Sequence, residues 1–183
     1  MKLDLPFLLV LIATPALGAT PYEIYASGRY EDAIKAGTVA GNAAGFAAAA
    51  RATLAEATTR LLPCLVCLRR AEELARKSVA KDARLVDRHV YLAVAMGYEA
   101  RIVGPVWARA HNYPGRAKDE LDLALEIDPK SPWALGALGG WNVEVVRTGG
   151  DRLANWLYGA TIDKGLTAFA AAFRVAPNNL SVR

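Results

Sequence analysis

The chain has 183 residues, of which 54% are hydrophobic and 22% are charged, and its formal net charge is +4. A chain of this length is expected to form one domain, and its apolar content excludes intrinsic disorder. The basic stretch of residues 69–88 also contains Glu72, Glu73, Asp82 and Asp87. Such alternation favours a mixed, solvated helix surface over a nucleic-acid patch.

Residues 1–19 have the features of a cleaved export signal. Lys2 supplies a positive charge, residues 5–13 form an apolar run, and small residues permit cleavage after Gly18 or Ala19. The run is too short to cross a bilayer as a mature helix. The alternative is an uncleaved, buried helix.

The sequence after the signal contains no second long apolar stretch. We therefore expect a mature domain of residues 20–183 without stable membrane insertion. Its expected location is a bacterial periplasm or the outside of the cell.

Apolar residues at steps of three and four predict helices along the whole mature chain. The expected helices span residues 21–27, 31–40, 43–62, 65–80, 85–103, 117–127, 132–147, 151–158 and 162–175. Glycine or proline stands at most of their ends, and Asn112-Tyr113-Pro114-Gly115 is typical of a turn. No alternating strand pattern appears, so we predict an all-α protein with antiparallel neighbouring helices.

One helix pattern occurs three times. It begins with a small residue, has a larger apolar residue four positions later and a second small residue three positions after that, and ends at a helix stop five positions further on. Two clear copies and a weaker third are Ala117, Leu121, Ala124, Pro129; Gly165, Phe169, Ala172, Pro177; and Ala71, Ala75, Ser78, Ala83. The steps place a close-packing stripe on one helix face, and proline ends the helix. Repetition of this unit indicates stacked helical hairpins, and such arrays usually bind other molecules.

The segment Gly28-Arg29-Tyr30-Glu31-Asp32-Ala33-Ile34 resembles the G-x-Y-x-x-A-I signature of tetratricopeptide repeats (TPRs). The spacing from Ala117 to Pro129 is similar to the second helix of that repeat. Leu135, Leu138 and Gly139 match the first helix of a following one. The resemblance implies a TPR-like right-handed superhelix of antiparallel hairpins.

The chain departs from the family in its period, since Ala83 to Pro129 and Pro129 to Pro177 are longer than the family's repeat of about 34 residues. The additional residues fall at 102–114 and 148–160, where we expect extended inter-helix loops. Only six residues follow Pro177. We favour truncation or natural brevity over coverage of the last apolar face by a second copy.

Cys64 and Cys67 are the only cysteines. Three alternatives remain open for them: a structural disulfide, which an exported location permits, two free packed thiols, or a redox or metal role. Leu68 follows them, so they are not a c-type haem attachment site. A zinc site would need two more ligands, and the spacing of His89 and His111 fits no zinc motif. We therefore expect no metal and no cofactor.

The sequence offers no convincing catalytic residues, and we expect a protein that is not an enzyme. His89 lies in an apolar helix, which favours an interhelical hydrogen bond. Acidic pairs such as Glu72-Glu73 and Asp119-Glu120 are adjacent on a helix and do not face each other. Gly139-Gly140 is interpreted as a helix-packing pair.

Aromatic residues concentrate in the second half of the chain, near charged side chains and the two predicted loops. The candidate binding surface consists of Tyr98, Arg101, Trp141, Glu144, Trp156 and Tyr158. Trp156 is the strongest candidate for recognition. The alternative is that these side chains fill gaps between irregular repeats.

The function implied by the resemblance is that of an exported, non-catalytic scaffold for a protein or peptide partner. The alternative is a periplasmic solute-binding or transport accessory protein that holds a small ligand between helices. We expect no nucleic-acid partner.

Overall fold

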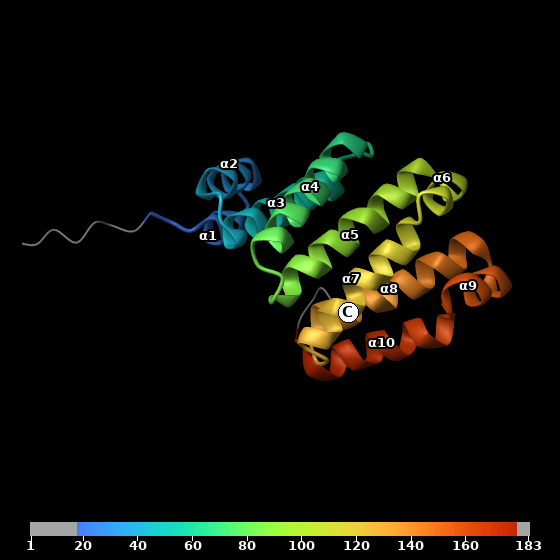
Figure 1. The fold of residues 1–183 in the computed structure, drawn as a ribbon. Helices are drawn as coiled ribbons and strands as arrows, with labels where there is room; N and C mark the ends of the chain where they lie inside the picture. Colours follow the sequence, from blue (N-terminus) through green and yellow to red (C-terminus); the bar gives the residue numbers. More distant parts are fainter. Residues whose placement is uncertain (1–17, 179–183) are drawn as a thin grey trace, which may run out of the picture.

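The computed structural model describes residues 18–178, and Figure 1 shows them as a row of neighbouring helices. The helices are α1 (Pro21–Ala26), α2 (Tyr30–Ala40), α3 (Ala43–Thr59), α4 (Leu65–Lys81), α5 (Val86–Val103), α6 (Pro105–Ala110), α7 (Tyr113–Ile127), α8 (Pro132–Gly149), α9 (Asp151–Tyr158) and α10 (Ile162–Val175). No strand occurs in the described range, so the all-α prediction is confirmed there. Residues 1–17 of the predicted export signal lie outside it.

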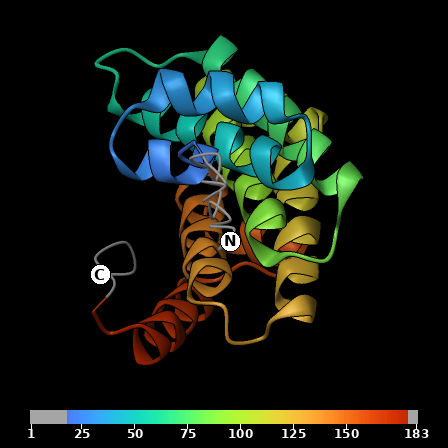
Figure 2. The same ribbon diagram turned by 90° about the vertical axis from the view of Figure 1, so that its left-hand side faces the viewer.

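The longer helices pack as adjacent antiparallel pairs. The main contacts connect α2 with α3, α3 with α4, α4 with α5, α5 with α7, and α8 with α10. Figure 2, viewed from the N-terminal side, shows that helix direction changes along the row, so the array is twisted. Within residues 18–178, no helix combines the length and hydropathy needed to cross a bilayer.

Antiparallel packing brings the carboxyl ends of α3, α5 and α8 to the same edge of the array, on the right of Figure 1. This edge carries the α3–α4 turn of residues 60–64, α6 and α9. We call it the tip edge. The turns α4–α5 and α7–α8 lie at the opposite edge.

The extended loop expected at residues 102–114 is wrong, because this segment contains α6. In residues 148–160 the predicted helix of residues 151–158 is confirmed as α9, and the connections on either side of it are short. Gly104 separates α5 from α6 and Gly150 separates α8 from α9, with φ values of 84° and 76° that favour glycine. The predicted turn at residues 112–115 is also wrong, since α7 begins at Tyr113. Asn112 precedes that helix at φ 50°, and Pro114 is tolerated in its first turn.

Small side chains allow the helices to approach closely, as the repeated spacing predicts. Ala117, Leu121 and Ala124 are buried in α7, and the matching Gly165 and Ala172 are buried in α10. Phe169, the larger residue of the copy in α10, packs against α8. A Cβ on Gly139 would lie only 2.7 Å from the ring of Phe169, so that ring packs against the α8 backbone.

His89 forms the interhelical contact expected for a core histidine. Its Nδ1 lies 2.6 Å from Oε2 of Glu120 on α7, and its Nε2 lies 2.9 Å from the carbonyl oxygen of Ala83. Both neighbours are acceptors, so the doubly protonated ring satisfies both. The hydrogen bond to Glu120 raises the pKa of His89, although burial opposes the rise.

Candidate functional site

A groove of about 910 Å³ lies between α5 and α8 and is also lined by α6, α7 and α9. We call it the α5/α8 groove. Its surface is largely apolar, and small residues from three long helices contribute Ala93, Gly97, Ala100, Ala117, Ala137 and Gly140. Each of these short side chains leaves space that a leucine or phenylalanine would fill. The groove is therefore built by residue size as well as by helix separation.

Two glycines widen the groove without an evident packing role. A Cβ on Gly97 or Gly140 would meet no atom within 4 Å outside its own helix neighbourhood. A glycine inside a helix costs about 1 kcal/mol relative to alanine. Gly139, one position away, instead packs against Phe169. The interpretation of Gly139-Gly140 as a packing pair thus holds for the first glycine and is wrong for the second.

The rim of the groove is positively charged. Glu144 pairs with Arg147 at 2.6 Å and with Arg101 at 3.5 Å, so two guanidinium groups share one carboxylate. The hydrogen bond from Arg147 lowers the pKa of Glu144, which keeps that carboxyl ionised. Arg109 on α6 also lines the groove and forms no ion pair within residues 18–178. The rim therefore offers arginine donors to an anionic group.

The structure gathers five of the six predicted surface residues around this groove: Tyr98, Arg101, Trp141, Glu144 and Tyr158. Trp141 is almost fully buried and donates its Nε1–H to the carbonyl oxygen of Pro114 at 2.9 Å. The ring of Tyr158 meets it edge-on, with centroids 6.4 Å apart. Trp141 is thus a fixed wall of the groove.

Trp156 lies apart from the groove lining, although it belongs to α9. Its side chain is 78% exposed. It therefore belongs to the outer surface of the tip edge.

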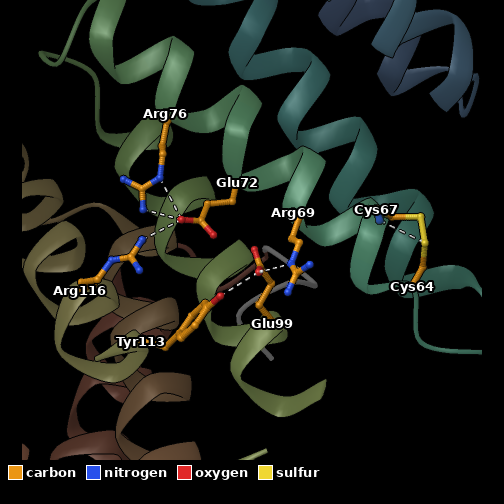
Figure 3. Close-up of polar contacts among 8 residues, drawn as sticks. All are labelled: Cys64, Cys67, Arg69, Glu72, Arg76, Glu99, Tyr113 and Arg116. Carbon is orange, nitrogen blue, oxygen red and sulfur yellow. Dashed lines mark hydrogen bonds and ion pairs between the residues drawn. A yellow bond between two sulfur atoms is a disulfide. The ribbon is translucent and has the colours of Figure 1, made fainter. Parts of the chain in front are cut away.

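A second polar cluster, which the sequence did not reveal, lies where α4, α5 and α7 meet (Figure 3). Glu99 of α5 is fully buried, and Tyr113 donates its hydroxyl hydrogen to Oε2 of Glu99 at 3.1 Å. Oε1 of Glu72 on α4 accepts hydrogen bonds from Arg76 and from Arg116, each at 2.9 Å. The two carboxyl groups come from different helices and interact with each other.

This environment favours the protonated form of the Glu99 carboxyl. Burial raises the pKa of Glu99 to about 7, and the neighbouring Glu72 adds to the rise. Burial also pushes the pKa of Glu72 upward, but the neighbouring Glu99 and the hydrogen bonds and charges of Arg76 and Arg116 outweigh it and leave the pKa below its usual value. Oε1 of Glu99 is buried without a donor among the described residues. Protonation of Glu99 removes the charge from this buried group.

A third cluster surrounds Arg51 of α3. Its guanidinium carbon lies 4.7 Å from the ring centroid of Tyr25, 5.4 Å from that of Tyr22 and 5.3 Å from that of Trp133. Nη1 also donates to the hydroxyl oxygen of Tyr91 at 3.2 Å. Cation–π contacts of this kind connect α1, α3, α5 and α8.

Cys64 and Cys67 form a disulfide at the start of α4 (Figure 3). The Cys67 backbone N–H also donates to Sγ of Cys64 at 3.2 Å. Among residues 18–178, no group of three or more histidine, cysteine or acidic side chains is arranged to hold a metal ion.

Comparison with known proteins identifies the fold. No protein-family model matches the chain, and no curated protein matches it. The crystal structure of TTC0263, a thermophilic TPR protein from Thermus thermophilus, is similar with a TM-score of 0.53 and 19% sequence identity. The similarity covers 89% of this chain and 91% of that one. The fold is therefore a TPR-like array of helical hairpins.

Proposed function

We propose that the protein is a non-catalytic scaffold that binds an acidic, partly apolar peptide segment of another protein in the α5/α8 groove. TPR-like folds typically mediate protein interactions, which supports a protein partner. The observation that carries the proposal is the pair of unpacked glycines, Gly97 and Gly140, inside the two helices that flank the groove.

The chemistry of the groove defines the peptide. The apolar floor accepts aliphatic or aromatic side chains, while arginines at the rim pair with carboxylates. Glu144 holds Arg101 and Arg147 in place before the peptide arrives. Apolar anchors give affinity, and the charged rim gives orientation.

A small ligand is the second candidate for the same groove. Its volume of about 910 Å³ falls within the range of about 300–1,000 Å³ that is typical of small-molecule pockets. Tyr98 and Tyr158 would then face the ligand beside the wall formed by Trp141.

Filling the groove is the test. Gly140→Leu is expected to weaken binding of acidic peptides, selected from a random peptide library on the wild-type protein, by at least about tenfold, because a leucine side chain occupies apolar space the peptide needs. Gly140→Ala is the matched control, since its Cβ meets no neighbouring atom and adds little volume. Fluorescence anisotropy of labelled peptides measures the affinities.

The selected peptides decide between the candidates. Equal affinity for the wild-type protein and Gly140→Leu would place peptide binding elsewhere and contradict the proposal. A library that yields no peptide, together with small molecules that raise the melting temperature of the wild-type protein but not of Gly140→Leu, would favour the small ligand.

We also propose that the protein is exported to a bacterial periplasm or secreted. The capping box of Thr20 and Glu23 supports this, because it begins α1 directly after the predicted cleavage site. The disulfide between Cys64 and Cys67 also suits an oxidising compartment. Mass spectrometry of native protein should find an N-terminus at Ala19 or Thr20. A native chain that retains Met1 would contradict export with cleavage.

A further inference from the structure

Exposed apolar side chains occur at all three tips of the array. The α3–α4 tip presents Leu61, Leu62 and Val66, the α6 tip presents Val106 and Trp107, and the α9 tip presents Leu153 and Trp156. Leu61 is fully exposed, and Leu62 and Val66 are nearly so. All three tips therefore carry exposed apolar side chains, of which Leu153 is only 38% exposed and lines the α5/α8 groove together with Val106. Scattered single exposed residues would need no explanation, but this repetition does.

The same tips carry a modest excess of positive charge. Residues 56–72, 99–112 and 144–158 contain seven arginines and five acidic side chains, which are Glu56, Glu72, Glu99, Glu144 and Asp151. All of these arginines are exposed. Arg70, Arg109 and Arg152, one from each tip, form no ion pair within the described part of the chain.

The opposite edge is electrically balanced. Residues 81–88 and 126–131, which contain the α4–α5 and α7–α8 turns, have four acidic and four basic side chains. The tip edge therefore has a small net positive charge that the opposite edge lacks.

The geometry points to peripheral binding of the tip edge to a lipid bilayer that contains anionic headgroups. The arginines contact the headgroups, and the leucine, valine and tryptophan side chains enter the boundary between headgroups and acyl chains. Tryptophan suits this boundary because its ring is apolar and its N–H is polar. The binding is superficial, with the helices of the array remaining outside the bilayer.

A bilayer fits these tips better than an acidic macromolecule does. A nucleic acid or a purely acidic protein surface contacts the arginines but offers no apolar contact to Leu61 and Leu62. The exposed apolar groups lie near the helix ends at one edge of the array. The ion pair of Arg101 with Glu144 at 3.5 Å connects α5 with α8 near their tips.

Vesicle flotation tests the inference with the mature, disulfide-bonded protein. Wild-type protein is expected to float with phosphatidylglycerol-containing vesicles and not with pure phosphatidylcholine vesicles. The double variant Leu61→Ser, Leu62→Ser is expected to lower the partition coefficient by at least about tenfold, because both side chains lose their apolar contact. The triple variant Arg70→Gln, Arg109→Gln, Arg152→Gln is expected to lower it similarly at low salt.

Matched controls come from the opposite edge. Val39 and Leu85 are also exposed, so the double variant Val39→Ser, Leu85→Ser removes comparable apolar surface without touching the tips. It should bind anionic vesicles like the wild-type protein. Tryptophan fluorescence adds a direct readout, since Trp107 and Trp156 are exposed while Trp141 is buried. Vesicles should shift the emission to shorter wavelength, and the shift should vanish in Trp107→Phe, Trp156→Phe.

Three outcomes would overturn the inference. The first is no flotation with anionic vesicles. The second is flotation that the Leu61, Leu62 variant and the opposite-edge variant reduce equally. The third is an affinity for heparin or polyglutamate that equals the affinity for vesicles and that the Leu61, Leu62 variant leaves unchanged. This result would assign the tip edge to acidic macromolecules. Arg109 also lines the α5/α8 groove, so the arginine variant is expected to affect peptide binding as well. The Leu61, Leu62 variant changes no residue of the groove lining and therefore separates the two tests.

Discussion

Gly37→Ala is expected to lower the free energy of unfolding by about 2–3 kcal/mol, because α2 and α3 touch through their backbones at this point. A Cβ on Gly37 would lie 2.3 Å from the carbonyl oxygen of Gly45 and 3.0 Å from the Cβ of Ala49. A backbone oxygen inside a helix cannot rotate away as a flexible side chain would. The two helices must therefore separate, and this loss exceeds the gain of about 1 kcal/mol from alanine's higher helix propensity.

Gly97→Ala is the matched control for Gly37→Ala. The substitution is chemically identical and also lies inside a helix, but its Cβ meets no atom within 4 Å. We expect it to raise stability by about 0.5–1 kcal/mol. Urea unfolding followed by circular dichroism measures both variants.

The location of the damage is a further part of the Gly37 prediction. The stability of a helical array is approximately the sum of contributions from each repeat and from its contacts with neighbouring repeats. The loss of stability in Gly37→Ala should therefore concentrate in the hairpin of α2 and α3. Hydrogen exchange should accelerate most in residues 30–59 and least in α8 and α10. A Gly37→Ala variant as stable as the wild-type protein would show that α2 and α3 are not in backbone contact.

The sequence predicted the long helices well because one physical signal defines them. A helix with a buried face repeats small and apolar residues at steps of three and four, and the stripe of Ala117, Leu121 and Ala124 is buried as predicted. Helix α6 has only six residues, which is too short for that period to appear. The chain there was consequently expected to be a loop.

The candidate site was predictable only in part. Tyr98, Arg101 and Glu144 stood out by their chemistry, and the structure brings them to one groove. The sequence does not show that Gly140 faces the open groove while Gly139 packs against Phe169. The two glycines are adjacent in the chain and face different sides of α8, and the sequence alone does not say which side meets another helix.

The carboxyl pair of Glu72 and Glu99 could not be predicted from the sequence for a different reason. Glu72 and Glu99 are 27 positions apart, on separate helices. Their proximity depends on how α4, α5 and α7 pack, which no spacing rule supplies. In the sequence Glu72 stands beside Glu73, whose exposed side chain pairs with Lys77 and is not part of the cluster.

The buried carboxyl of Glu99 should make the protein less stable as pH rises from about 4.5 to about 7. The unfolded chain loses this proton near the ordinary pKa of 4.5, while burial raises the pKa in the folded protein to about 7. The folded state binds more protons across that window, so the free energy of unfolding falls with rising pH. Glu72 acts outside this window, since its lowered pKa costs stability only as the solution becomes more acidic than about pH 4.5.

Glu99→Gln is expected to abolish most of that decline. A glutamine amide cannot ionise, has nearly the size of the protonated acid, and can accept the hydrogen bond from Tyr113. The variant should be as stable as the wild-type protein at pH 5 and about 1–3 kcal/mol more stable at pH 8. Urea unfolding at pH 5, 6.5 and 8 measures the difference.

The comparison between the two proteins isolates Glu99 from other titrating groups. The raised pKa of His89 also removes stability as pH rises, but it does so equally in both proteins. Glu73→Gln is the matched control on the surface of α4, and it should leave the slope between pH 5 and 8 unchanged. If Glu99→Gln instead lost stability at every pH, Glu99 would be an ionised partner of Arg69, which lies 3.8 Å away. The sign of the change at pH 8 therefore determines whether Glu99 is a protonated, neutral group or one member of an ion pair between α5 and α4.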